Sequence, residues 1–193
     1  MILVLTTPRT GSTWYCEHLA KQHSLENLDE YFGEFEYTLS EQNNKLEYIS
    51  NNKDVVFKCF PWHLKNIRTN FLRAGFLENK LLKLADEIHI LTRMDFESQI
   101  KSFYIAGLTG VWDGSPQELE TIELDKAKFE YCDRHLKNGY WHLSEYYKDL
   151  KCKLIDYSEL PFNTDINKKY IRPVKWSSEP IIKDIQISKL FNK

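Results

Sequence analysis

Hydroxyl groups and one arginine are concentrated in a short segment near the start of the chain. Residues 7–13 read TPRTGST, directly after the mainly apolar residues 2–6 and just before a helical pattern that begins at Ser12. Amides at a helix N-terminus lack intrahelical partners and favour an anion. Gly11 permits close approach of the backbone, and Arg9 adds a permanent positive charge. The pattern predicts a loop that binds phosphate or a similar anion.

This loop departs from the one that ATP-hydrolysing proteins use. The Walker A pattern, GxxxxGK[ST], requires a glycine five residues before Gly11 and a lysine directly after it. The chain has Thr6 and Ser12 at those positions. An ordinary strand-to-helix turn, capped by Ser12 or Thr13, is the simpler alternative that the loop alone leaves open.

A second group of polar side chains follows another apolar run. Arg93 comes directly after residues 88–92, and the helix expected after it carries Ser98 and Ser102. Residues four apart lie on one helix face, so both hydroxyls can join Arg93 at a second phosphate. The alternative is a surface ion pair between Arg93 and Asp95, with both serines merely solvated.

Apolar runs alternate with longer helical patterns along the chain. This alternation predicts parallel strand pairing and one P-loop-type, three-layer α/β domain over residues 1–193, with a central, mostly parallel sheet of about four to five strands flanked by helices. The predicted strands are residues 2–6, 55–60, 88–92 and 153–157. The predicted helices begin at Ser12, cover 63–74 and 78–86 on either side of Gly75, run from Asp95 to near Gly107, and cover 117–150 as two helices separated near Asn138 and Gly139.

Charge and composition restrict the kinds of partner. The 193 residues include 26 Lys plus Arg and 28 Asp plus Glu, for a net charge of −2. This balance argues against a nucleic-acid or membrane-surface binder, which needs a broad positive field, but it allows one local basic pocket. The aromatic residues Trp112, Tyr140 and Trp141 are assigned to the core by default, although such side chains can also stack on a sugar.

The cysteines and the first residues indicate the compartment. Cys16, Cys59, Cys132 and Cys152 lack CxxC spacing, so free and mostly buried thiols in a reducing environment are expected. No apolar run approaches the roughly 20 residues of a membrane-spanning helix, and the first residues lack the basic flank of a secretory signal. We therefore expect a cytoplasmic protein, with no membrane partner and no metal site.

Taken together, the two polar segments resemble those of the PAPS-dependent sulfotransferases. These enzymes take a sulfuryl group from 3′-phosphoadenosine 5′-phosphosulfate (PAPS) and release 3′-phosphoadenosine 5′-phosphate (PAP). The segment TTPRTGSTW is similar to the family's 5′-phosphosulfate loop, PKSGTTW or PRSGST, and RMDFESQIKSFYIA is similar to its 3′-phosphate segment. The closer similarity is to the bacterial carbohydrate branch, of trehalose and nodulation-factor type, whose segment reads approximately RRDxxxQAVSLYRA. The resemblance implies PAPS as donor and a hydroxyl of a carbohydrate or other small molecule as acceptor.

The resemblance also implies roles for individual residues. Asp29-Glu30-Tyr31-Phe32 is similar to the E-[FY]-F element of that branch, which makes Glu30 the base that deprotonates the acceptor, while Arg9 assists catalysis at the phosphosulfate. Trp14 is also expected to pack the first helix onto the core. The implied cofactor-binding residues are Arg9, Thr10, Gly11, Ser12, Thr13, Trp14, Arg93, Ser98, Ser102 and Arg172.

The chain departs from the sulfotransferase pattern at two places, so alternative functions stay open. Small-molecule sulfotransferases carry a catalytic His in a KTHxP-like element, but this chain has Phe60 there, with Lys58 and His63 nearby as other candidates for the base. The late basic segment of the family has no clean match in this chain. Arg172 and Trp176 are therefore assigned to the cofactor site by their position in the sequence alone. An inactive PAP- or PAPS-binding protein and a divergent P-loop kinase remain the alternatives to an active sulfotransferase. The oligomeric state is left open.

Overall fold

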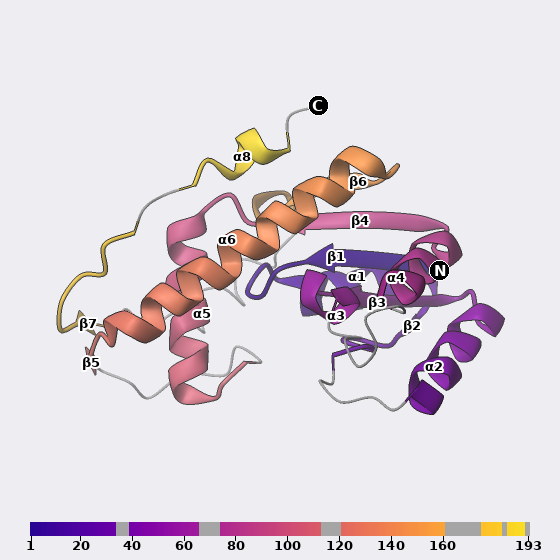
Figure 1. The fold of residues 1–193 in the computed structure, drawn as a ribbon, viewed down its shortest axis with the longest axis horizontal. Coiled ribbons are helices and arrows are strands. Elements are labelled where there is room, and N and C mark those ends of the chain that lie inside the picture. The colour runs from indigo at the N-terminus through magenta and orange to yellow at the C-terminus, as the bar shows by residue number, and fades with distance from the viewer. Residues whose placement is uncertain (34–38, 66–73, 113–120, 161–174, 183–184, 192–193) are drawn as a thin grey trace.

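The central sheet has five strands, all of them paired in parallel (Figure 1). The computed structural model describes residues 1–33, 39–65, 74–112, 121–160, 175–182 and 185–191. Its strand order is β2-β3-β1-β4-β6, so β1 lies in the centre between β3 and β4. The fold is therefore the predicted three-layer α/β domain, with a central parallel sheet flanked by helices.

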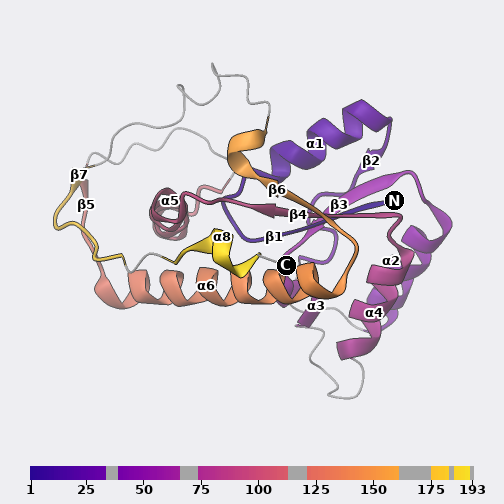
Figure 2. The same cartoon turned by 90° about the horizontal axis from the view of Figure 1, so that it is seen from above.

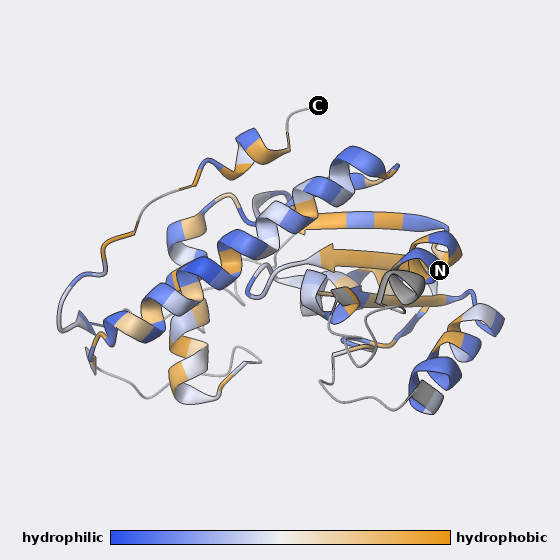
Figure 3. Ribbon diagram, in the orientation of Figure 1, coloured by the Kyte–Doolittle hydropathy of each residue, from blue (hydrophilic) through white to orange (hydrophobic). Residues whose placement is uncertain are grey.

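The alternation of side chains along β1 explains why both faces of the sheet are covered. Leu3 and Leu5 join the larger apolar core, whereas Ile2 and Val4 join a smaller one on the opposite face. Helix α1 covers the smaller core, and α2, α3, α4 and α6 cover the larger (Figure 2). Figure 3 shows β1 as hydrophobic along its length, as expected of a strand buried on both sides.

The bounds of the elements are as follows. The strands are β1 Ile2–Thr6, β2 Glu26–Asn27, β3 Val55–Cys59, β4 Glu87–Thr92 and β6 Lys153–Asp156, with β5 Thr121–Ile122 and β7 Lys175–Trp176 forming a separate parallel pair. The helices are α1 Ser12–His23, α2 Leu39–Asn51, α3 Pro61–Lys65, α4 Ala74–Leu84, α5 Phe96–Thr109, α6 Lys126–Asp149 and α8 Ile187–Leu190, with a short 3₁₀ turn at Tyr157–Glu159.

The predicted break in the long helical segment is wrong. Helix α6 continues through Asn138 and Gly139 for 24 residues. Gly139 is needed for contact and not for a turn, since a Cβ atom placed there would lie 2.8 Å from Thr7 Cγ2. The glycine therefore lets α6 approach the loop that follows β1.

Other predictions differ in detail. Gly75 lies inside α4 and does not separate two helices. Asp95 caps α5 as predicted, but the helix ends at Gly110, which adopts the left-handed conformation, and Gly107 lies within it. Strand β2 and helix α2 were not predicted, because β2 has two residues and α2 buries few apolar side chains.

Most of the predicted thiols and aromatic core residues are buried, but not all. Cys16, Cys59 and Cys132 are buried, Cys152 is half-buried, and none of the four forms a disulfide. Tyr140 is fully buried as expected, whereas Trp112 and Trp141 are 52% and 53% exposed. The assignment of these two tryptophans to the core is therefore wrong. No described helix is long and apolar enough to cross a membrane.

Candidate functional site

The predicted polar segments meet at one edge of the sheet. Strands β1, β3 and β4 are neighbours and run in parallel, so the loops that follow them lie at the same carboxyl edge. Ligands of open α/β sheets bind at this edge. The candidate site consists of the loop after β1, the end of β3, the start of α5 and the segment after β2.

The loop after β1 is held in an unusual backbone conformation. Arg9 has φ of 64° and Gly11 has φ of 74°, both in the left-handed region. For a non-glycine residue this conformation costs about 1–2 kcal/mol, and such strain is concentrated at ligand-binding sites. The loop therefore keeps a shape that its local sequence does not favour.

Buried hydroxyl groups stabilise that shape. The Thr10 Oγ1 atom lies 2.5 Å from Thr6 Oγ1 and donates to the Thr7 carbonyl at 3.0 Å. Thr6 Oγ1 also donates to the Leu91 carbonyl at 3.0 Å, which ties the loop to β4. The Thr10 side chain is fully buried, so in this conformation its hydroxyl serves the loop itself.

Helix α1 begins without a side-chain cap. Its N-cap is Gly11, which makes no side-chain capping hydrogen bond, in contrast to Asp95 of α5 and Asp125 of α6. The expected capping by Ser12 or Thr13 is therefore wrong, although an ordinary strand-to-helix turn at this position stays the alternative to an anion site. The first amides of α1 have no intrahelical acceptor and carry the positive end of the helix dipole, which suits an anion.

The two arginines of the predicted motifs lie together. Arg93 Nη1 donates to the Arg9 carbonyl at 3.1 Å, and Arg9 Nε donates to Ser102 Oγ at 2.9 Å. Arg9 Nη1 also donates to the Trp112 carbonyl at 2.6 Å. The loop after β1 and helix α5 thus form one structure, although they are far apart in the sequence.

Arg93 keeps one donor without an acceptor. Among the described residues, Arg93 Nε is buried and has no hydrogen-bond partner, while the guanidinium lies 4.5 Å from the centre of the Tyr157 ring. The alternative ion pair with Asp95 is absent from the described part of the chain. Burial acts to raise the Asp95 pKa, but hydrogen bonds from Ser98 and the Arg93 charge lower it overall. A buried guanidinium N–H without an acceptor is suited to an anionic ligand.

Gln99 and Tyr140 brace this arrangement; sequence reasoning gave Gln99 no role and assigned Tyr140 only to the aromatic core. Gln99 Nε2 donates to Thr7 Oγ1 at 2.9 Å and to the Pro8 carbonyl at 2.6 Å. Tyr140 donates to Gln99 Oε1 at 2.6 Å and accepts from the Arg93 amide at 2.9 Å. Burial raises the Tyr140 pKa to about 12, so the phenol stays protonated as this donor. The loop, α5 and α6 are therefore linked through two buried side chains.

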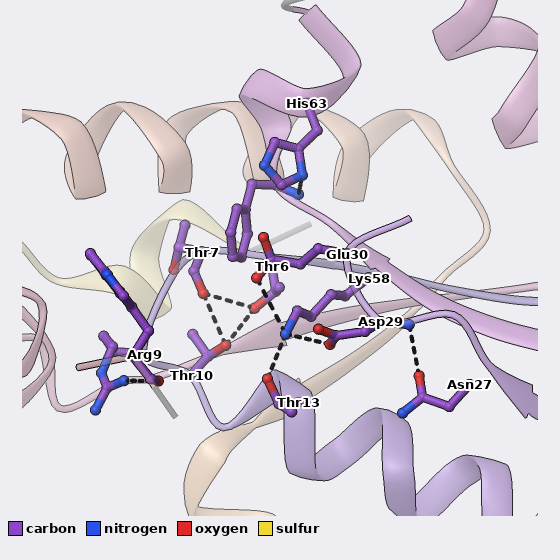
Figure 4. A network of polar contacts seen from close by, with 12 residues as sticks. Thr6, Thr7, Arg9, Thr10, Thr13, Asn27, Asp29, Glu30, Lys58 and His63 are labelled. Atoms are coloured by element: carbon purple, nitrogen blue, oxygen red, sulfur yellow. Dashed lines mark hydrogen bonds and ion pairs between the residues drawn. The ribbon is translucent and has the colours of Figure 1, made fainter. Parts of the chain in front are cut away.

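A buried lysine connects the loop to the segment after β2 (Figure 4). Lys58 Nζ lies 2.7 Å from Asp29 Oδ1 and 3.3 Å from Glu30 Oε1, and it donates to Thr13 Oγ1. The lysine side chain is 4% exposed, whereas those of Asp29 and Glu30 are 52% and 38% exposed. Asp29 has φ of 48°, and its carbonyl accepts from the Lys58 amide at 2.8 Å. An ammonium group thus lies between two carboxylates and the start of α1.

His63 is neutral and already has a hydrogen-bond partner. Its Nδ1 atom accepts from the Phe60 amide at 3.3 Å, and the two rings lie 4.7 Å apart. Burial, with a smaller effect of the Lys58 charge, lowers the His63 pKa from 6.5 to about 4. Phe60 is buried at the end of β3, in the position that the KTHxP-like element gives to a histidine.

The remaining predicted residues lie further from these contacts or outside the described chain. Trp14 is half-buried, stacks on His18 at 5.2 Å and packs against the core beneath α1. Ser98 is half-buried, and its amide donates to Asp95 at 3.0 Å. Trp176 packs on Tyr104 and Phe129, between α5 and α6. Arg172 lies outside the described residues.

No protein-family profile matches the chain, and no curated protein sequence matches it. In the part of the chain that the structure describes, no group of three or more His, Cys, Asp or Glu side chains is arranged to hold a metal ion.

Proposed function

We propose that the chain is a PAPS-dependent sulfotransferase that transfers the sulfuryl group to a hydroxyl of a carbohydrate or another small acceptor and releases PAP. The observation that carries the proposal is the direct link between the two predicted phosphate segments, from Arg93 to the Arg9 carbonyl and from Arg9 to Ser102. A nucleotide with phosphate at both the 3′ and 5′ positions needs two anion sites near each other, and these two segments supply both.

The 5′-phosphosulfate is assigned to the loop after β1. Support comes from the uncapped start of α1 at Gly11 and from the left-handed conformation of Arg9. The amides and hydroxyls of Ser12 and Thr13 add donors there. The 3′-phosphate is assigned to Arg93 with Ser98 and Ser102, and the Arg93 Nε atom, buried without a partner among the described residues, supports this assignment. Trp14 stays a proposed cofactor contact, and Arg172 one that the described residues leave untested.

In the proposed reaction the acceptor oxygen attacks sulfur in line with the bridging phosphate oxygen. A new bond forms between sulfur and the acceptor oxygen, the bond from sulfur to the 5′-phosphate breaks, and its electron pair stays on PAP. The acceptor proton passes to Glu30. Lys58 and the first amides of α1 stabilise the charge on the departing oxygen, an effect typically of about 3 kcal/mol for each preorganised donor.

The contacts of Lys58 support the assignment of Glu30 as the base. The ammonium group contacts Thr13 on the loop side and both Asp29 and Glu30 on the other side. It can therefore stabilise the leaving phosphate while Asp29 balances its charge, which leaves Glu30 to take the proton. His63 is a weaker candidate for the base, because its Nδ1 atom already accepts the Phe60 amide.

An inactive PAP- or PAPS-binding protein is the second candidate. It is favoured by Phe60, a side chain without a titratable group at the end of β3. Transfer of radiolabelled sulfate from PAPS to a panel of sugars and phenols separates the two. Labelled product supports the sulfotransferase. PAP binding without any transfer would instead favour the binding protein, and binding of ATP in preference to PAP would favour a P-loop kinase.

We also propose a cytoplasmic location and a small molecule or glycan as the partner, with no nucleic acid or membrane partner. None of the four cysteines forms a disulfide, which supports a reducing compartment. The net charge of −2 argues against a partner that carries many phosphates.

A further inference from the structure

A row of aromatic side chains lies beside the candidate site. Its rings contact one another in the order Trp62, His135, Phe103 and Trp112, and Tyr131 also contacts His135, with ring centres 4.1 to 5.8 Å apart. Its members come from four different segments, namely α3, α5, α6 and the residues after α5. We refer to these five side chains as the aromatic row: Trp62, Phe103, Trp112, Tyr131 and His135.

One end of the aromatic row lies next to the residue that follows β3. Trp62 lies 5.0 Å from Phe60, which follows β3 and its Lys58. Trp62 also lies on the side of Gly139 that faces the loop, since a Cβ atom at Gly139 would be 3.4 Å from Trp62 Cζ3 and 2.8 Å from Thr7 Cγ2. The row therefore begins where α6 contacts the loop after β1.

Trp112 connects the aromatic row to the same loop. Its backbone carbonyl accepts the hydrogen bond from Arg9 Nη1 at 2.6 Å, while its ring packs on Phe103 at 5.8 Å. Trp112 as a whole is nevertheless 52% exposed, and Tyr131 is 59% exposed. Trp112 and Tyr131 therefore leave aromatic surface open to water within one cluster of contacting rings, and contiguous patches of this kind mark binding sites more often than single exposed side chains do.

The chemistry of the aromatic row favours a sugar over a planar phenol. Small apolar ligands bind in enclosed pockets that cover about 70–90% of their surface. Trp112 and Tyr131 instead leave more than half of their surface exposed, and polar edges alternate with the rings at His135 and Tyr131. Burial lowers the His135 pKa, so its ring is neutral at neutral pH and adds no competing charge. Such a surface can stack on the C–H face of a pyranose while the sugar hydroxyls stay hydrated.

We propose that the aromatic row is the acceptor subsite and that it stacks a pyranose ring of a carbohydrate, with Trp112 as a specificity-determining residue. This inference rests on the proposed function, because it takes the site as one for sulfuryl transfer. The row then holds the acceptor beside the loop after β1, from Trp62 next to Phe60 to Trp112, whose carbonyl accepts from Arg9.

The test compares two equally exposed tryptophans. Trp112→Ala removes the ring but keeps the carbonyl that binds Arg9, and Trp141→Ala is the control, since Trp141 is 53% exposed and lies outside the aromatic row. Saturation-transfer NMR with cellobiose or chitobiose, in the presence of PAP, measures sugar binding directly. We expect Trp112→Ala to weaken sugar binding about tenfold and Trp141→Ala to leave it unchanged. Tyr131→Ala should also weaken sugar binding, which provides a second, independent test.

The outcomes separate this inference from the proposed function. Sugar binding that is absent, or that survives Trp112→Ala and Tyr131→Ala, overturns the inference. Binding of 4-nitrophenol to the row with no binding of either disaccharide also overturns it, in favour of a phenolic acceptor. PAP affinity is measured separately by calorimetry on the same variants and should not change. Failure of the wild-type chain to bind PAP would count against the proposed function, whatever the sugar result.

Discussion

The Arg93 guanidinium donates a hydrogen bond of 3.1 Å to the backbone carbonyl of Arg9. This contact joins the end of β4 to the loop after β1, and Arg9 in turn reaches Ser102 on α5. Two segments that look independent in the sequence therefore share one network. Replacing either arginine should therefore weaken anion binding at both proposed phosphate positions.

Replacing Arg93 tests that network. Arg93→Ala removes a permanent cation and the donor to the Arg9 carbonyl, so PAP affinity should fall at least about tenfold, which is about 1.4 kcal/mol and close to the smallest contribution of a charge-assisted hydrogen bond. Calorimetric titration with PAP measures the loss. Arg134→Ala is the control, because Arg134 is exposed on α6. Equal affinity in wild type and Arg93→Ala would remove Arg93 from the site.

Glu30→Gln tests the proposed base. The substitution keeps the shape of the side chain, and Asp29 remains 2.7 Å from Lys58 to balance the buried charge. The sulfuryl transfer rate should fall by about 10²- to 10⁴-fold, the usual contribution of a general base, with PAP affinity unchanged. Single-turnover transfer and calorimetry measure the two effects. Retention of the full transfer rate would exclude Glu30 as the base.

Lys58→Met tests stabilisation of the leaving group. Because Asp29 and Glu30 are 52% and 38% exposed, water can solvate both carboxylates once the ammonium is gone, so the fold should survive. Transfer should slow by about 10²- to 10³-fold, as for loss of one preorganised donor. Thermal unfolding provides the control for folding. A folded variant with normal transfer would contradict the role given to Lys58.

Gly139→Ala tests the contact between α6 and the loop. Alanine favours a helix over glycine by up to about 1 kcal/mol, but its Cβ would lie 2.8 Å from Thr7, whose Oγ1 is already held by Gln99. We expect the cost of overpacking, about 1–3 kcal/mol, to exceed this gain in helix propensity, so the melting temperature should fall. Gly107→Ala in α5 is the matched control, since nothing lies within 4 Å of its Cβ, and this variant should be more stable. Stabilisation by both substitutions would show that α6 does not press on the loop.

His63 makes stability depend on pH. Burial keeps its pKa at about 4 in the folded chain, against 6.5 for the unfolded reference, so the unfolded state binds the proton first as the pH falls. The contribution of His63 to the free energy of unfolding is fully present above about pH 6.5 and is lost progressively as the pH falls to about 4. Urea unfolding across that window should show a shallower decline for His63→Asn, whose side-chain oxygen can still accept the Phe60 amide. His23→Asn, at an exposed position, should behave like wild type; if His63→Asn does so as well, His63 is not the cause.

The fold was largely predictable because its signals are local. Short runs rich in apolar residues identified β1, β3 and β4, and the polar residues that end them placed the loops at one edge of the sheet. The helix break at Gly139 failed for a physical reason. The local preference of glycine for turns was outweighed by close packing of α6 on Thr7.

The site was only partly predictable, because its decisive contacts are long-range. The types of Arg9 and Arg93 suggested anion binding, but the hydrogen bond between the two segments depends on the pairing of β1 with β4. The contact of Lys58 with Asp29 and Glu30 depends likewise on the pairing of β2 with β3. Trp112 was assigned to the core because exposure cannot be read from residue type.

Calorimetric titration of PAP into the wild-type chain, with ATP in a parallel titration, tests most directly that the two segments form one site for a nucleotide with 3′ and 5′ phosphates. We predict saturable binding of one PAP per chain, with ATP at least about tenfold weaker because it lacks the 3′-phosphate that Arg93 would hold. Absence of saturable PAP binding, or ATP binding as tight as PAP binding, would contradict the account.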